Sequence, residues 1–190
     1  MLSFEQLFKK KKNSLSPADF SHPMTLLKSC HEKILYFSTA LLTLSEKLQQ
    51  EGWNEQSKIS AEQIRRYFNI AAPEHHKDEE LHLFPAIIAL DPGLQNPDIK
   101  AQLNLINQMV KEHVETDALW DKLDQMLEGQ SKNTLDDLNA LAIQFATNLS
   151  QHAETENNEI FPFAEQHIDD ATFKKMGKAI AKRRGIKLNR

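Results

Sequence analysis

Histidine and glutamate stand four residues apart at two places in the sequence, as His75-x-x-x-Glu79 and His152-x-x-x-Glu156. On an α-helix this spacing places an imidazole and a carboxylate side by side, one turn apart. In both segments a Phe-Pro pair follows the glutamate at the same offset. Because imidazoles and carboxylates bind iron, manganese and zinc, the repeat predicts equivalent ligands for a pair of metal ions. Each glutamate would bridge both ions, while histidines hold the ions individually.

Four long stretches of helix-forming residues each carry an apolar stripe at steps of three or four residues. Every stripe is interrupted by a histidine near one level, and three add a carboxylate one turn further on. The histidines are His31, His75, His113 and His152, and the carboxylates are Glu79, Asp117 and Glu156. A lone histidine on such a stripe is usually a hydrogen-bonded core residue. Burying even one unpaired carboxylate costs roughly several kcal/mol, so we expect bound cations between these groups.

The same steps of three or four residues predict which residues before and after the candidate ligands face the core. The second stripe passes through Ala71 before the histidine level and continues through His82 and Ala86 after it. The fourth stripe continues to Phe163.

Four polar residues near the candidate ligands have less certain roles. His76 and Glu80 lie about 100° off the second stripe, which favours the outer face or a pair behind the ligands. His82 is on the stripe and is expected to line the site rather than bind. Asp117 is either a direct ligand or a partner that orients a histidine.

The elements that must position these residues are long helices joined by short loops. Glycine and proline punctuate the chain, and no alternating apolar and polar run of strand length occurs. Short loops between long helices predict an all-α, up-down-up-down four-helix bundle with an extra, basic C-terminal helix. Pro73 is expected to kink or break the second helix. The predicted helices cover residues 24–51, 54–90, 98–128, 131–165 and, more weakly, 170–184.

Composition places these helices in one ordinary domain. The chain has 190 residues, 40% of them hydrophobic and 26% charged, with a net charge of −4. These values argue against nucleic acid as a partner, and no apolar run is long enough for a transmembrane segment. The single cysteine, Cys30, excludes an internal disulfide and a cysteine-based zinc site. Without a signal-peptide pattern, a cytoplasmic location is expected. The expected domains are a flexible basic arm over 1–22, the bundle over 23–165 and a basic C-terminal helix or tail over 166–190.

At this point the sequence resembles the hemerythrin-like (HHE cation-binding) family over residues 24–165. The segment from His75 to Pro85 is close to the family's HHxxEExxLFP signature, and residues 152–162 resemble its second copy. His31 and His113 occupy the positions at which the first and third helices of the family supply ligands. The resemblance implies two iron ions in a non-haem di-iron centre, with two bridging carboxylates and an oxo or hydroxo bridge.

Two departures separate this chain from the oxygen-carrying members of the family. Those proteins have a second histidine four residues after the third-helix histidine, where this chain has Asp117. They also use an aspartate five residues after the last histidine, where this chain has Asn157, leaving Glu156 as the candidate ligand. More carboxylate and fewer imidazole ligands favour oxidised iron, which disfavours reversible O2 carriage.

The pattern therefore favours a di-iron centre that binds or reacts with O2, peroxide or nitric oxide, in a redox or oxidative-stress role. Iron sensing or iron-centre repair, O2 carriage and a metal-free helical interaction module remain as alternatives. Manganese or zinc fits the same ligands, and the sequence does not identify a redox partner.

Overall fold

The computed structural model describes residues 20–129 and 134–188. Every regular element in these ranges is helical, which confirms the all-α prediction. The first long helix is α2 (Pro23–Glu51) and the third is α6 (Pro97–Leu127). The second is a continuous run of α3 (Glu55–Arg66), η2 (Tyr67–Ala71), α4 (Ala72–Asp78), η3 (Glu79–Leu83) and α5 (Phe84–Ile88). The fourth joins α7 (Leu135–Thr155), η4 (Glu156–Ile160) and α8 (Phe161–His167), and α9 (Asp170–Arg183) follows it.

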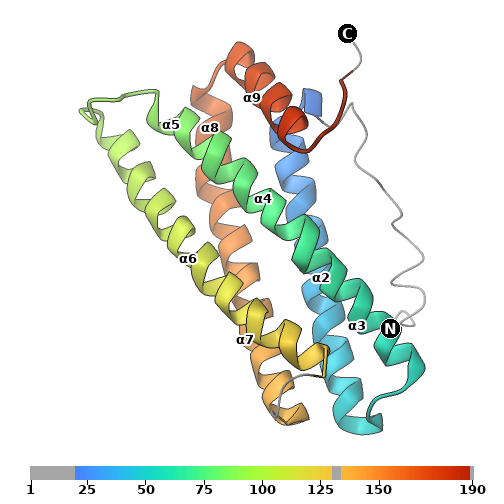
Figure 1. Ribbon diagram of the computed structural model, residues 1–190. Coiled ribbons are helices and arrows are strands. Elements are labelled where there is room, and N and C mark those ends of the chain that lie inside the picture. The colour runs from blue at the N-terminus through green and yellow to red at the C-terminus, as the bar shows by residue number, and fades with distance from the viewer. Residues whose placement is uncertain (1–19, 130–133, 189–190) are drawn as a thin grey trace.

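The long helical runs lie side by side, and consecutive runs point in opposite directions (Figure 1). α2 packs extensively along α7, which also packs against α6. α9 crosses the end of the molecule at which α2 begins and α8 ends (Figure 1). Among the described residues, no helix combines the length and the apolar character needed to cross a membrane. Apart from residues 20–22, the predicted N-terminal arm lies outside the described residues.

Within residues 20–129 and 134–188, three π turns interrupt the α-helical hydrogen bonding, and each ends just before a residue that precedes a proline. In each turn an N–H donates to the carbonyl five residues earlier: Ala72 to Tyr67, Phe84 to Glu79 and Phe161 to Glu156. A proline in a regular α-helix collides with the carbonyl four residues earlier, and a wider turn relieves that collision. The predicted break at Pro73 does not occur, because η2 accommodates the proline and the helix continues into α4.

Each π turn holds one residue more than an α turn, and so it shifts the buried face by one position. After η2, Ala72 is buried and Ala71 is exposed. The same shift buries Leu83, Ile87 and Ala164 in place of the predicted His82, Ala86 and Phe163. The prediction at Ala71 is therefore wrong, whereas His82, Ala86 and Phe163 are partly buried, and Ala86 and Phe163 still pack against the apolar core.

Two apolar clusters form the core, one at each end of the helical runs. The α9-end cluster includes Leu27, Leu83, Ile106, Ile160 and Ile180. The far-end cluster includes Leu41, Ile64, Leu123, Leu138 and Phe145. Along each of the four runs, the level of the predicted ligands lies between the residues of these two clusters.

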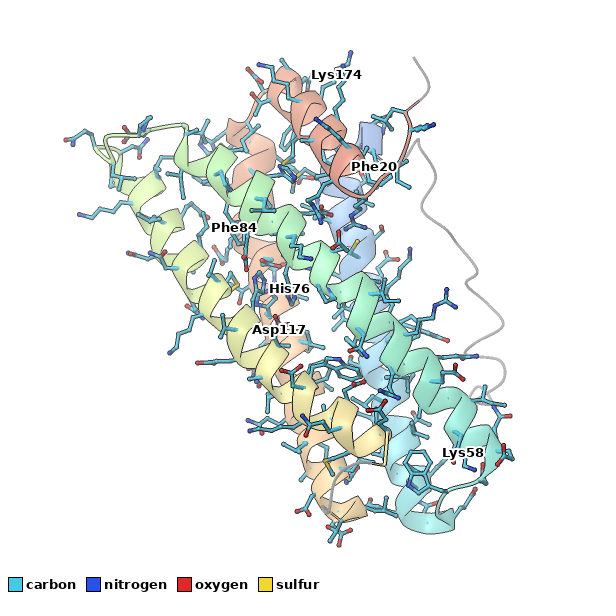
Figure 2. The ribbon with its side chains drawn as sticks, viewed as in Figure 1. Phe20, Lys58, His76, Phe84, Asp117 and Lys174 are labelled. Carbon is cyan, nitrogen blue, oxygen red and sulfur yellow. The ribbon has the colours of Figure 1, made fainter. Side chains whose placement is uncertain are left out.

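The predicted C-terminal helix is α9, and it packs closely onto the start of the chain that the structure describes. Met176, Ile180 and Ala181 are buried in the α9-end cluster. A Cβ added at Gly177 would lie 2.0 Å from the carbonyl oxygen of Phe20, and Figure 2 shows Phe20 beside α9. Only a glycine permits this approach, which fixes α9 against the beginning of α2.

Two arginines attach the end of α9 to the second helical run. Arg183 and Arg184 both form ion pairs with Asp78, which is fully buried, and Arg183 also pairs with Glu74. Arg183 donates a further hydrogen bond of 2.8 Å to the backbone carbonyl of Glu74. Because Asp78 directly precedes the predicted ligand Glu79, this contact joins α9 to the backbone next to the candidate site.

Candidate metal centre

Six buried side chains converge between the two apolar clusters and form two groups that share Glu79 and Glu156. We name the group completed by His31 and His75 position 1, and the group completed by His113 and His152 position 2. Within each group, one ligand atom per residue lies within 4.8 Å of every other. Two histidine pairs that share two carboxylates are an arrangement suited to two neighbouring cations.

Glu79 is the first residue of the π turn η3 and reaches both positions. Its Oε1 lies 3.2 Å from Nε2 of His75, which precedes it by one turn on α4. Its Oε2 lies 3.6 Å from Nε2 of His113, which projects from α6. The two oxygens of one carboxylate therefore face histidines of different positions, as a bridging ligand requires.

Glu156 occupies the matching place in the fourth run, as the first residue of η4. Its Oε2 lies 3.0 Å from Nε2 of His31 on α2 and 3.4 Å from Nε2 of His152 on α7. The internal repeat of the sequence is thus also a repeat of geometry, because each glutamate begins a π turn and contacts one histidine of each position.

Hydrogen bonds to the outer ring nitrogens fix the orientation of three histidines. The Nδ1 contacts are His31 with Asn157 Oδ1 at 3.0 Å, His113 with Glu80 Oε1 at 2.6 Å, and His152 with Glu112 Oε2 at 2.9 Å. A neutral histidine that donates Nδ1–H outward presents the lone pair of Nε2 to the interior, whereas an Nε2 that also carries a proton can donate it to Glu156. The neutral form is the one that a metal ligand needs.

The inward nitrogens of position 2 face each other closely. Nε2 of His113 and Nε2 of His152 lie 3.0 Å apart. With both Nδ1 atoms donating to carboxylates, two lone pairs oppose each other unless a proton or a cation lies near both. The contact therefore favours a positive charge at position 2.

Burial controls the protonation of the group. Burial and the neighbouring Glu156 raise the pKa of Glu79 well above its ordinary value. Burial opposes ionisation of Glu156 as well, but hydrogen bonds from His152 and His31 outweigh it and lower the pKa of Glu156. Burial and the nearby His152 lower the pKa of His113 to about 4. The two glutamates therefore do not ionise together easily without a cation to offset their repulsion.

Unsatisfied polar atoms show that the residues present fit a bound cation. Among the described residues, both ring nitrogens of His75, both carboxylate oxygens of Glu79 and Oε1 of Glu156 are buried without a hydrogen-bond partner. Leaving a buried polar atom unpaired costs about 1–3 kcal/mol, and more for a charged group. Imidazole nitrogen and carboxylate oxygen are suitable ligands for iron, manganese or zinc.

Aromatic rings cover the site toward the α9-end cluster. Phe161 is buried and stacks on His31 with 5.1 Å between ring centroids. Phe84, from the matching position in the second run, is stacked with His113 at 6.4 Å. These rings restrict the access of water to the ligands from this side and hold the imidazole planes in place.

Asp117, predicted as a direct ligand or an orienting partner, and His82, predicted to line the site, lie outside both groups. The side chain of Asp117 is 63% exposed, and its Oδ1 lies 3.8 Å from Nδ1 of His76. A three-residue step from His113 leads to buried Thr116, whereas the four-residue step to Asp117 leads toward solvent. His82 is half-buried on η3 and is also outside the two groups.

His76 lies behind a ligand, which is one of the two roles expected for it. It is buried and stacks on His113 with 3.9 Å between centroids, and Figure 2 shows it between α4 and α6 with Asp117 nearby. Glu80 also lies behind a ligand, as one of its two expected roles required. Asn157 and Glu112 were missed as outer partners, although each is adjacent in sequence to a predicted ligand.

Comparison with known proteins bears directly on this geometry. The family model described as the hemerythrin HHE cation binding domain matches residues 22–164. The chain belongs to this family. The match spans all six side chains of positions 1 and 2, and it confirms the resemblance seen in the sequence.

A curated relative is similar along nearly the whole chain. It is a protein of Haemophilus influenzae named only as an uncharacterized protein. It is 29% identical over 171 residues, which cover 90% of this chain and 94% of the relative. The family and the two groups of histidine and glutamate together support a metal-binding function for this hemerythrin-like chain.

Proposed function

We propose that this hemerythrin-like chain binds two iron ions, one at position 1 and one at position 2, and that it binds or reacts with O2, peroxide or nitric oxide. The observation that supports the proposal is the sharing of Glu79 and Glu156 by two buried histidine pairs. Shared carboxylates hold two cations close enough to act on one small molecule. When bound, the iron pair would supply the redox chemistry.

The residues of the chain would hold and isolate that pair. Glu79 and Glu156, which both positions share, and Nε2 of the four histidines would hold the ions, and the outer hydrogen bonds keep three of the four imidazoles oriented. Phe84 and Phe161 limit water at the site. We also propose that residues 23–165 form the up-down-up-down four-helix bundle that carries this centre, with residues 166–190 as an additional basic segment.

Metal analysis after anaerobic purification tests the metal content. The expected result is about two iron ions per chain, as in dinuclear carboxylate bundles, with an absorption band of an oxo or hydroxo bridge after exposure to air. Manganese or zinc in place of iron would contradict the iron assignment. Protein that binds no metal at all would instead favour a helical interaction module.

The Glu79→Gln variant tests the bridging role. The amide cannot bridge two cations as a carboxylate does, so we expect the loss of one or both ions and a lower melting temperature in the presence of metal. Glu154→Gln, at an exposed position of α7, is the matched control and should keep the wild-type iron content. Wild-type stoichiometry in Glu79→Gln would contradict the bridging role.

Rapid mixing of the iron-loaded protein with each small molecule separates the candidate activities. Fast oxidation by peroxide or fast binding of nitric oxide supports the proposal. A reversible colour change on cycling O2 would instead indicate a carrier. Transfer of iron to an apo-protein acceptor, without reaction toward these molecules, would indicate iron-centre repair.

A further inference from the structure

The geometry points to two unequal metal positions, with position 2 binding its ion more tightly and position 1 holding the exchangeable ion. This inference rests on the proposed function, because it concerns the two ions assigned there. It follows from the groups behind the ligands and not from the ligands themselves.

The side chains that could contact the ions directly are of the same types at position 1 and position 2. Each position has two imidazoles, and both positions share the same two carboxylates. All six residues are 5% exposed or less. A difference between the positions must therefore come from the second layer of contacts, which sets the basicity and the rigidity of each imidazole.

At position 2 both imidazoles are backed by carboxylates. Glu80 lies 2.6 Å from Nδ1 of His113, and Glu112 lies 2.9 Å from Nδ1 of His152. A hydrogen bond to a carboxylate is charge-assisted, and it increases the electron density at the opposite ring nitrogen. Both ligand nitrogens of this position are therefore strengthened toward a cation.

At position 1 neither imidazole has a charged acceptor at Nδ1. His31 contacts the neutral amide oxygen of Asn157 at 3.0 Å. Nδ1 of His75 has no hydrogen-bond partner among the described residues. The imidazoles of this position are therefore weaker donors, and His75 is held in place by packing alone.

Charges further from the ions reinforce the contrast. On the position 2 side, the ion-pair partners found for Glu80 and Glu112 within the described residues are the ligand histidines, and Glu112 accepts one more hydrogen bond from the neutral amide of Gln108. Two other acidic residues on the run that carries His75 are offset, because Arg183 pairs with both Glu74 and Asp78, and Arg184 pairs with Asp78. Position 2 thus has more negative charge that is not offset by arginine or lysine.

Titration of the metal-free full chain with Co²⁺, followed by visible absorbance and calorimetry, tests the inference. We expect two steps, with the tighter step at position 2. Glu80→Gln and Glu112→Gln should weaken the tighter step by about 10-fold or more, as is usual for outer partners of metal ligands, with little effect on the weaker step. Asn157→Asp should strengthen the weaker step by about 10-fold.

Matched controls replace exposed carboxylates on the same helices. Glu115→Gln on α6 and Glu154→Gln on α7 should leave both steps unchanged. Circular dichroism of each metal-free variant verifies that the fold is retained. As a second measurement, removal of Co²⁺ by a chelator should show a fast and a slow phase, and Glu80→Gln should accelerate the slow phase.

The outcomes separate this inference from the proposed function. Two equal steps, an equal effect of Glu80→Gln on both, or an effect of Asn157→Asp on the tighter step would overturn the inference and leave the dinuclear site intact. A chain that binds no Co²⁺ and no iron would overturn both.

Discussion

At the scale of single residues, Glu79 and Glu156 are the same amino acid, but their surroundings favour different protonation states. Glu156 accepts hydrogen bonds from His31 and His152, and its pKa is lowered despite burial. Glu79 lacks such bonds among the described residues, and burial beside Glu156 raises its pKa. In the metal-free chain, one carboxylate of the pair therefore retains a proton at a pH where an exposed glutamate would have lost it.

Metal binding is therefore expected to release this proton. A cation requires the ionised form of Glu79 and the neutral form of His152, and although burial lowers the pKa of His152, its contacts with Glu156 and Glu112 outweigh burial and raise that pKa. At least one proton per chain should therefore leave as position 1 and position 2 fill, and affinity should rise with pH. His113 contributes little, because its pKa of about 4 keeps it neutral near pH 7. Calorimetry in two buffers of different ionisation enthalpy measures the release. Identical heats in both buffers would contradict it.

The raised pKa of Glu79 also determines whether the metal-free chain becomes more or less stable as pH rises. Because the pKa of Glu79 is raised by folding, the folded chain binds more protons than the unfolded chain above the ordinary value of 4.5. This group therefore makes the metal-free fold less stable as pH rises through its raised pKa. A bound cation removes that penalty.

At the scale of elements, the attachment of α9 depends on a buried charge. Replacing Asp78 with Asn leaves Arg183 and Arg184 without their common anionic partner, and we expect a loss of roughly 3 kcal/mol or more of unfolding free energy. Denaturant unfolding measures it. Lys28→Gln, which breaks an exposed pair with Glu165, is the control and should change stability by less than about 1 kcal/mol. Equal effects would argue against the attachment.

The close approach of α9 to Phe20 gives a steric prediction. The methyl group of Gly177→Ala would lie 2.0 Å from the carbonyl oxygen of Phe20, so α9 must shift. Despite the better helix propensity of alanine, we expect destabilisation of about 1–3 kcal/mol in thermal or denaturant unfolding. Gly93→Ala adds a methyl group at ordinary contact distances of 3.6 Å and above, and should be close to neutral. A neutral Gly177→Ala variant would show that α9 adjusts freely.

Elements and ligands differ in how far the sequence could predict them. The helices and the convergence of His31, His75, His113 and His152 with two glutamates follow from regular spacing, and the structure has them. The residues that are buried after each glutamate do not follow from regular spacing, because a pattern based on a constant number of residues per turn cannot predict a π turn. The proline after each Phe was the available signal.

The residues that contact the outer ring nitrogens of the histidines could not be predicted from a periodic pattern either, for another reason. Asn157, Glu80 and Glu112 act across helices, on histidines far away in the sequence. Their roles depend on the rotation of one helix against its neighbour, which spacing along a single helix does not define. The same rotation turns Asp117 to solvent and buries Thr116.

At the scale of the whole molecule, the candidate metal centre lies between two separate apolar clusters. The four long runs are joined at this level by polar side chains, several of them without partners. A bound cation pair would therefore connect all four runs at the level where apolar packing is interrupted.

Metal removal should consequently lower thermal stability. A ligand present at about 100 times its dissociation constant stabilises the folded state by about 2.7 kcal/mol, which corresponds to roughly 5–11 °C for a chain of this size. Differential scanning calorimetry with and without a chelator measures the shift. The same chelator should have little effect on Glu79→Gln that has lost its metal. An unchanged melting temperature of the wild type would contradict a structural contribution of the ions.

The π turns carry a consequence for related sequences. η3 and η4 are each equivalent to a single residue inserted into a regular helix, and each begins at a glutamate that positions 1 and 2 share. A relative that lacks one residue between such a glutamate and the following Phe-Pro would keep the ligands and yet rotate the rest of that helix by about 100°. Alignments that forbid gaps inside helices would conceal this kind of evolutionary change.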